Sequence, residues 1–198
     1  MNTALTITGL TKKYSNFVLD NISFSIPFGS IVGLIGENGA GKSTTINSIL
    51  GLIKKDSGKI TVLGHDIDTF DCAVKEKIGV VFDGRNFSEE LTPAKLSKVL
   101  RDIYSSWEQS YFNRLLDQLN IPATKKIKTF SKGMKMNLSI AVAFAHHPQL
   151  LILDEATSGL DPLVRDDILD IFLEFVQDAE LSILVSSPIP IALEKVAD

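Results

Sequence analysis

The chain lacks the features of a secreted or membrane-spanning protein. Its single cysteine, Cys72, leaves no partner for an internal disulfide. The first residues lack the basic and then apolar layout of a signal peptide. The longest nearly uncharged stretch of the second half, residues 136–145, is too short to span a bilayer. We therefore expect a cytoplasmic protein whose role at a membrane, if it has one, is peripheral.

A surplus of positive charge is also missing. The formal net charge is −4, so the composition offers no general electrostatic attraction for DNA or RNA, and no nucleic-acid partner is expected. With 198 residues, 44% of them hydrophobic, the chain can bury one good core and carry a subdomain. We expect a single domain over residues 1–198.

The sequence does contain a phosphate-binding loop. Residues 36–44 read G-x-x-x-x-G-K-S/T between the apolar run 31–35 and a helical pattern. Lys42 is expected to reach the β- and γ-phosphates of a bound triphosphate, and Ser43 to offer its hydroxyl to Mg²⁺. The backbone of a glycine-rich loop and the start of a helix bind phosphate together. The predicted nucleotide-binding residues of this loop are Gly36, Glu37, Asn38, Gly39, Ala40, Gly41, Lys42, Ser43 and Thr44.

The region before the loop favours antiparallel strands. Residues 5–8 and 21–26 alternate apolar and polar side chains around a turn at Tyr14, and residues 56–66 resemble a hairpin. An aromatic residue ahead of a phosphate-loop strand can stack on adenine, although a lone tyrosine is more often packing. Tyr14 is therefore a candidate adenine contact, with plain packing as the alternative.

The middle of the chain has helix signals. Thr92 followed by Pro93 predicts a helix over residues 94–104, and Ser106-x-x-Gln109 forms a capping box that predicts a second over 107–119. A third helix is expected over residues 132–146, with His146 and His147 as surface caps at its C-terminal end. The apolar stripe of the second helix is predicted to be core: Trp107, Tyr111, Phe112, Leu115, Leu116 and Leu119.

A second chemical landmark is a strand that ends in two acids. The run at residues 150–153 is too apolar for a half-exposed strand, which predicts a central parallel one, with further buried strands at 78–82 and 181–186. Ligands of such sheets gather at the carboxyl ends of the strands. Asp154 is thus a candidate Mg²⁺ ligand, and Glu155 a candidate catalytic residue that orients or deprotonates the attacking water.

Four motifs in this order resemble the ATP-binding cassette of ABC transporters: residues 36–44, 130–134, 150–155 and 158–161. More narrowly, the chain resembles the ATPase subunits of small bacterial ABC-2-type exporters, including those that export amphipathic peptides. The resemblance implies an α/β fold of the P-loop NTPase class, with a mainly parallel core sheet and an N-terminal antiparallel β region. Residues 1–83 and 131–198 would form this core, and about 84–130 a helical subdomain.

The resemblance also implies partners. The signature residues Ser131, Lys132, Gly133 and Met134 would complete the ATP site of a second subunit in a head-to-tail homo- or heterodimer, and Asp161 would lie at the dimer seam. The helical subdomain would meet an integral membrane permease. The protein would then work at the cytoplasmic face of the membrane, with ATP and Mg²⁺ as its cofactors.

Several positions depart from the family pattern. Asp83 replaces a glutamine but can still ligate Mg²⁺ through a hard oxygen. Ala156 replaces a proline, and the signature reads Phe-Ser-Lys-Gly-Met. Pro188 replaces the histidine expected to contact the γ-phosphate and has no donor to offer. The chain also ends at Asp198, before the further strands that such cassettes usually have.

Three hypotheses follow. The first is an ATP-hydrolysing exporter subunit, which Glu155 favours. The second is a hydrolysis-impaired module that dimerises on ATP, which Pro188 favours. A soluble ABC ATPase of DNA repair or translation is third, because the sequence has neither a long heptad insertion nor a second cassette.

Overall fold

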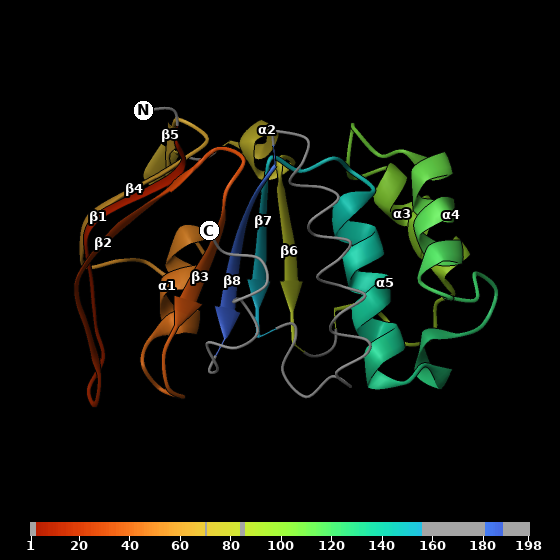
Figure 1. Cartoon of the computed structure of the whole chain (residues 1–198), viewed down its shortest axis with the longest axis horizontal. Coiled ribbons are helices and arrows are strands. Elements are labelled where there is room, and N and C mark those ends of the chain that lie inside the picture. The colour runs from red at the N-terminus through yellow and green to blue at the C-terminus, as the bar shows by residue number, and fades with distance from the viewer. Residues whose placement is uncertain (1–2, 70, 84–85, 156–180, 188–198) are drawn as a thin grey trace.

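The structure is a computed structural model that describes residues 3–69, 71–83, 86–155 and 181–187. Within these residues the strands form two four-stranded sheets, with the orders β2-β1-β4-β5 and β3-β8-β7-β6. Figure 1 shows the layers from left to right: the antiparallel sheet, α1, the parallel sheet, α5, and then α3 with α4. The described residues therefore adopt the α/β architecture that the sequence predicts.

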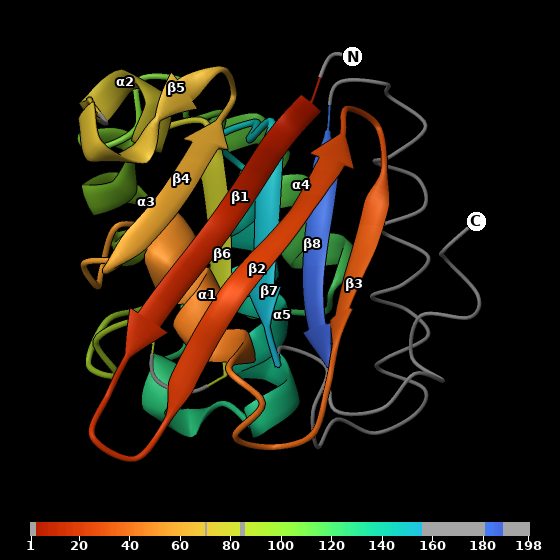
Figure 2. The ribbon, with the colours of Figure 1, turned by 90° about the vertical axis from the view of Figure 1, so that its left-hand side faces the viewer.

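The first sheet is antiparallel and comes from the N-terminal third of the chain. It contains β1 (Thr3–Lys13), β2 (Val18–Pro27), β4 (Ser57–Val62) and β5 (His65–Asp66). In β1, Leu5 and Ile7 are buried whereas Thr6 and Thr8 are not, as the alternation of residues 5–8 predicts. Figure 2 shows this sheet in front of α1 (Lys42–Ile49), whose Ile46 and Ile49 belong to the same hydrophobic core.

The second sheet is parallel in each of its described pairs. It contains β3 (Ile31–Ile35), β6 (Ile78–Phe82), β7 (Leu150–Asp154) and β8 (Ser182–Ser187). The four apolar residues of β7 are fully buried, because β6 and β8 flank the strand and the sheet is covered on both faces. The prediction of a central parallel strand is thus confirmed.

Helices cover the face of the parallel sheet opposite α1. They are α3 (Pro93–Arg101), α4 (Gln109–Gln118) and α5 (Lys132–Phe144), with the short α2 (Cys72–Lys75), η1 (Ile67–Thr69) and η2 (Ile127–Thr129) in the connections. The hydroxyl of Thr92 caps α3 by accepting from the Lys95 N–H at 3.3 Å. Four residues of the predicted apolar stripe, Phe112, Leu115, Leu116 and Leu119, are buried in the core, and Trp107 and Tyr111 are half-buried against it.

The capping box predicted at Ser106 is wrong. Helix α4 begins at Gln109 with Glu108 at the cap, and the Ser106 hydroxyl instead donates to the His146 carbonyl oxygen at 2.6 Å. The Glu108 N–H also donates to the Ala145 carbonyl at 2.8 Å. These two hydrogen bonds satisfy carbonyl oxygens at the C-terminal end of α5. The Ser106 hydroxyl is used in this tertiary contact and therefore does not form the local capping box.

The prediction that His146 is a surface cap is also wrong. Its side chain is only 1% exposed and stacks on Tyr104, with 4.2 Å between the ring centroids. Its Nδ1–H donates to the Val142 carbonyl oxygen at 3.2 Å, and burial lowers the pKa of the imidazole. His147, in contrast, lies at the surface, where its Nε2 is 2.9 Å from the Glu108 carboxylate.

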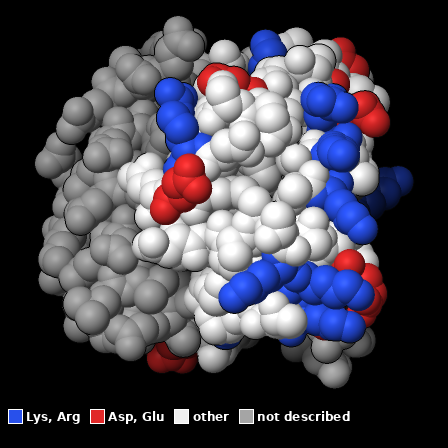
Figure 3. All heavy atoms as spheres, turned by 90° about the vertical axis from the view of Figure 1, so that its right-hand side faces the viewer, with Lys and Arg blue, Asp and Glu red and all other residues white. Residues whose placement is uncertain are grey.

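The outer side of the helical layer carries local positive charge despite the net negative chain. Figure 3 looks onto this side and shows Lys and Arg gathered in a band along one edge of the described surface. Two lysines between α4 and α5 are paired: Lys126 and Lys128 both contact Glu90 and together hold the pKa of that carboxyl at about 2. In the described part of the chain no helix is long and apolar enough to cross a bilayer.

Candidate nucleotide-binding site

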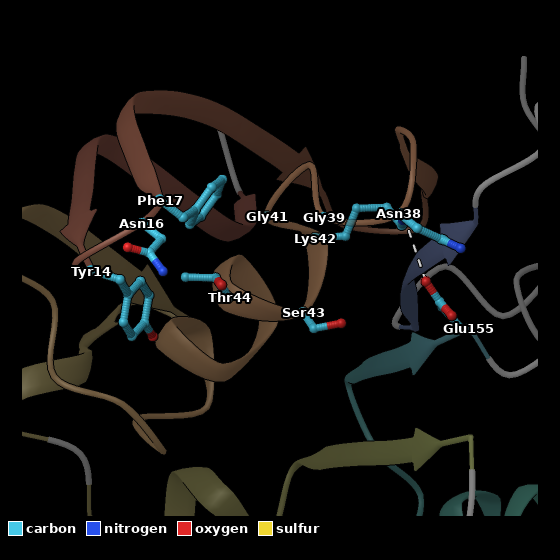
Figure 4. Close-up of a pocket in the computed structure, with 10 residues that line it drawn as sticks. All are labelled: Tyr14, Asn16, Phe17, Asn38, Gly39, Gly41, Lys42, Ser43, Thr44 and Glu155. Atoms are coloured by element: carbon cyan, nitrogen blue, oxygen red, sulfur yellow. Dashed lines mark ion pairs between the residues drawn. The ribbon is translucent and has the colours of Figure 1, made fainter.

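A cavity of about 610 Å³ opens beside the phosphate-binding loop. Its volume lies in the range of small-molecule sites. Figure 4 shows the ten lining residues, which come from the β1–β2 turn, the loop with the start of α1, and the end of β7. They are Tyr14, Asn16, Phe17, Asn38, Gly39, Gly41, Lys42, Ser43, Thr44 and Glu155. Most of the predicted loop residues and Glu155 therefore share one cavity.

The loop joins β3 to α1 in a conformation that needs glycine. Gly39 and Gly41 have φ angles of 86° and 97°, which L side chains rarely adopt. A Cβ on Gly41 would also lie 2.8 Å from a Leu19 methyl and 2.9 Å from the Phe17 ring. Because Gly41 is the N-cap of α1 and has no side chain, the first N–H groups of this helix have no side-chain cap. This is the arrangement in which a helix N-terminus binds an anion.

Lys42 is the buried cation of the site. It is 6% exposed, and its Nζ donates to the carbonyl oxygens of Gly36 at 2.7 Å and Glu37 at 3.1 Å. Glu155 lies across the cavity, with its Oε1 3.6 Å from Nζ (Figure 4). The loop thus folds around its own lysine and presents one ammonium group to an anionic ligand.

The two acids at the end of β7 are oriented by their neighbours. Asp154 Oδ1 accepts from the hydroxyls of Ser43 at 3.4 Å and Ser186 at 2.7 Å. Glu155 has a φ of 51°, a left-handed conformation that is uncommon outside glycine, and its N–H donates to Ser186 Oγ at 2.9 Å. Ser43 and Asp154 therefore meet, as expected for two ligands of one Mg²⁺, and Glu155 turns back toward the cavity.

Tyr14 lines the cavity, but it is not alone there. Its ring is 46% exposed and lies 6.5 Å from the Phe17 ring, with 28° between the planes, and Lys12 Nζ is 5.5 Å from its centroid. Asn16 and Phe17 also line the cavity and are not among the residues predicted from the sequence. The signal available for Phe17 was a second aromatic in the same polar turn, three residues after Tyr14.

Asp83 lies at the adjacent strand end but makes a different contact. Its N–H donates to the Asp154 carbonyl oxygen at 3.1 Å, whereas its carboxylate oxygens lie 3.0 and 3.1 Å from Lys132 Nζ. Asp83 and Lys132, which both depart from the family pattern, are 49 residues apart in the sequence and form an ion pair. In the described ranges, no three His, Cys, Asp or Glu side chains form a metal site by themselves.

The signature residues lie at the start of α5. Ser131 is its N-cap and accepts from the Met134 N–H at 3.2 Å, and none of the ten cavity-lining residues belongs to this helix. The expected contacts of Ser131, Lys132, Gly133 and Met134 with a second subunit stay a prediction. Asp161, Ala156 and Pro188 lie outside the described residues.

Comparison with known proteins identifies the family. The family model for the ABC transporter matches residues 19–158. The chain belongs to the ABC transporter family. It is 37% identical over 172 residues to the ABC transporter ATP-binding protein YtrB of Bacillus subtilis (strain 168), which covers 87% of the chain and 59% of YtrB. It is 34% identical to the bacitracin transport ATP-binding protein BcrA of Bacillus licheniformis, covering 100% of the chain and 66% of BcrA.

A solved structure supports the same ABC assignment. The structure of an ATP binding subunit of an ABC transporter matches with a TM-score of 0.88 and 30% identity, covering 99% of this chain and 84% of that one. The family resemblance and the fold class drawn from four short motifs are thereby confirmed. The chain spans roughly three fifths to two thirds of the length of these two curated relatives.

Proposed function

We propose that the chain is the ATP-binding and ATP-hydrolysing subunit of a bacterial ABC exporter, dimerising head-to-tail on ATP to drive a membrane permease. One observation carries the hydrolytic part: Lys42 and Glu155 face each other across the cavity at 3.6 Å, beside the contact of Ser43 with Asp154. A phosphate-binding cation, a pair of hard oxygen donors and a candidate base are the groups that phosphoryl transfer to water requires.

The cavity would hold the phosphates of ATP at one end and its adenine at the other. The open N-terminus of α1 and the Lys42 ammonium would bind the phosphates, because both place positive charge at the loop. The rings of Tyr14 and Phe17, at the β1–β2 turn, would stack on adenine. Glu37 and Asn38 would contribute loop backbone N–H groups to the same phosphates, whereas the Ala40 N–H donates to the Glu37 carbonyl oxygen at 3.1 Å.

Ser43 and Asp154 fit Mg²⁺, because a hydroxyl and a carboxylate already converge there. When bound, Mg²⁺ neutralises phosphate charge. Glu155 would accept a hydrogen bond from the attacking water and take its proton, while Lys42 holds the phosphate chain in place. Asp83 would join this site only after giving up Lys132, which now occupies its carboxylate.

Two observations support the proposed dimer: the family to which the chain belongs and the position of the signature residues at the start of α5. Ser131, Lys132, Gly133 and Met134 lie at a helix N-terminus, which suits them to meet the phosphates held by a second subunit. Asp161 would lie at that seam. The helices between residues 84 and 130 would form the subdomain that meets the permease at the cytoplasmic face of the membrane. The similarity to BcrA, a bacitracin transport ATP-binding protein, supports a role in transport.

The alternative is a nucleotide-gated dimerisation module with impaired hydrolysis. The observation that favours it is Pro188, which stands where the family has a histidine and cannot donate a hydrogen bond to the γ-phosphate. Nucleotide binding and dimerisation are common to both functions. The rate of ATP hydrolysis distinguishes the exporter ATPase from the hydrolysis-impaired module.

The experiment compares the wild type with Glu155→Gln, which keeps the shape of the side chain but removes the base. We expect the wild type to release phosphate from Mg–ATP, and the variant to release almost none while accumulating an ATP-bound dimer in size-exclusion chromatography with light scattering. Lys59→Ala is a surface control, because this lysine is 69% exposed on β4. Equal phosphate release by the wild type and Glu155→Gln would reject Glu155 as the base. An absence of turnover in the wild type together with dimerisation on ATP would favour the module.

A further inference from the structure

Strand β8 places a buried serine beside both acids of the site. Ser186 is fully buried, and it is the in-register neighbour of Asp154 in the parallel β7–β8 pair. Its hydroxyl donates to Asp154 Oδ1 at 2.7 Å, a short bond typical of a charged acceptor. Ser186 Oγ also accepts a hydrogen bond from the Glu155 N–H at 2.9 Å. One hydroxyl group therefore contacts the side chain of one acid and the backbone of the next.

The second of these bonds holds an unusual turn. Glu155 follows β7 directly and has a φ of 51°, so its backbone is left-handed. Left-handed backbone is unfavourable for a residue with a Cβ and persists where neighbouring groups hold it. This turn brings the Glu155 carboxylate to Lys42, 3.6 Å away. The hydrogen bond from the Glu155 N–H to Ser186 Oγ therefore helps to direct the Glu155 side chain toward Lys42.

We propose that Ser186 is a positioning residue that orients Asp154 for the metal and Glu155 for the attacking water. This inference rests on the proposed function, since it presumes the roles given there to the two acids. Ser186 is fully buried behind the two acids. It acts through the two acids, by fixing one oxygen of Asp154 and the backbone of Glu155.

Removing the hydroxyl should slow the reaction without weakening ATP binding. Ser186→Ala leaves the Asp154 oxygen without its shortest donor and the Glu155 N–H without an acceptor. Loss of such a supporting bond typically lowers metal affinity or activity about 10–100-fold. We expect kcat to fall by that factor with KM for ATP nearly unchanged, because the phosphate contacts of Lys42 are intact. Ser186→Thr keeps a hydroxyl on a strand position and should restore most of the rate.

The same strand supplies a matched control. Ser182 is also fully buried on β8 and also makes two hydrogen bonds, donating to the Pro27 carbonyl oxygen at 3.2 Å and accepting from the Gly29 N–H at 3.1 Å. It lies at the opposite end of the strand from the acids. Ser182→Ala therefore loses a comparable buried hydroxyl, and stability with it, but should keep the wild-type kcat.

The test measures three quantities for the wild type, Ser186→Ala, Ser186→Thr and Ser182→Ala: kcat, KM for ATP and the unfolding temperature. A fourth does not depend on turnover. It is the Mg²⁺ concentration that half-saturates thermal stabilisation by a non-hydrolysable ATP analogue, and we expect it to rise about tenfold in Ser186→Ala alone. If the wild type shows no measurable turnover, this titration decides.

Two results would overturn the inference. In one, Ser186→Ala keeps the wild-type kcat and Mg²⁺ requirement. In the other, Ser182→Ala loses as much activity as Ser186→Ala, which would make the effect one of general stability. Glu155→Gln, measured in parallel, separates this inference from the proposed function. An inactive Glu155→Gln beside a fully active Ser186→Ala rejects the role of Ser186 alone, whereas a fully active Glu155→Gln rejects the proposed base.

Discussion

The two left-handed glycines of the phosphate loop offer a matched pair of substitutions. Gly39 and Gly41 have similar φ angles, 86° and 97°, so alanine at either position meets the same backbone strain, about 1–2 kcal/mol. They differ in their surroundings. No atom lies within 4 Å of a Cβ on Gly39, whereas a Cβ on Gly41 would approach Leu19 to 2.8 Å and Phe17 to 2.9 Å. Overpacking of this kind adds about 1–3 kcal/mol.

We therefore expect Gly41→Ala to lower the free energy of unfolding by about 2–5 kcal/mol and Gly39→Ala by about 1–2 kcal/mol. Gly41→Ala should also weaken ATP binding more than Gly39→Ala, because the Cβ would displace Phe17, which lines the cavity. Urea denaturation and calorimetry measure the two effects. Equal losses in both variants would refute the crowding at Gly41, and stabilities unchanged from the wild type would refute the left-handed loop itself.

Three further predictions concern groups outside the loop. Burial lowers the pKa of His146 below 6.5, so the unfolded chain takes up the proton first and the free energy of unfolding should fall as the pH drops below 6.5; urea titrations at several pH values measure this fall, and His146→Gln should lack it. The ion pair of Asp83 with Lys132 is 35% and 55% exposed, so a double-mutant cycle on unfolding should give a coupling of about 0.2–1 kcal/mol, and a value several times larger would contradict the exposure. Pro188→His should raise steady-state turnover by about 10²–10³ with ATP affinity unchanged, and a variant no faster than the wild type would show that this position does not limit catalysis.

Features with a local signal could be predicted from the sequence. The phosphate loop is contiguous, and the strand before it and the helix after it follow from short patterns at residues 31–49. The buried strand β7 is a plain apolar run. Thr92 with Pro93 marks the start of α3, because a side-chain cap and a proline at the first turn act within one helical turn.

Features that depend on distant residues could not be predicted. His146 is buried because Tyr104, 42 positions earlier, stacks on it, and the motif at Ser106 fails because its hydroxyl finds the carbonyl of His146. The contact of Ser186 with Asp154 requires the register of β8 on β7, which periodicity does not determine. Phe17 reaches the cavity only because the β1–β2 turn lies against the loop.

The central claim is that the loop cavity holds ATP through Lys42, and calorimetry with Mg–ATP tests it directly. A charge-assisted hydrogen bond from this buried ammonium to a phosphate would be worth about 1.5–3 kcal/mol, so Lys42→Ala should reduce the affinity by at least about 10–100-fold. Lys59→Ala, which removes an exposed lysine of β4 outside the cavity, should bind ATP like the wild type. Loss of ATP binding in Lys42→Ala alone is the predicted result, and equal affinity of Lys42→Ala and the wild type would contradict the account.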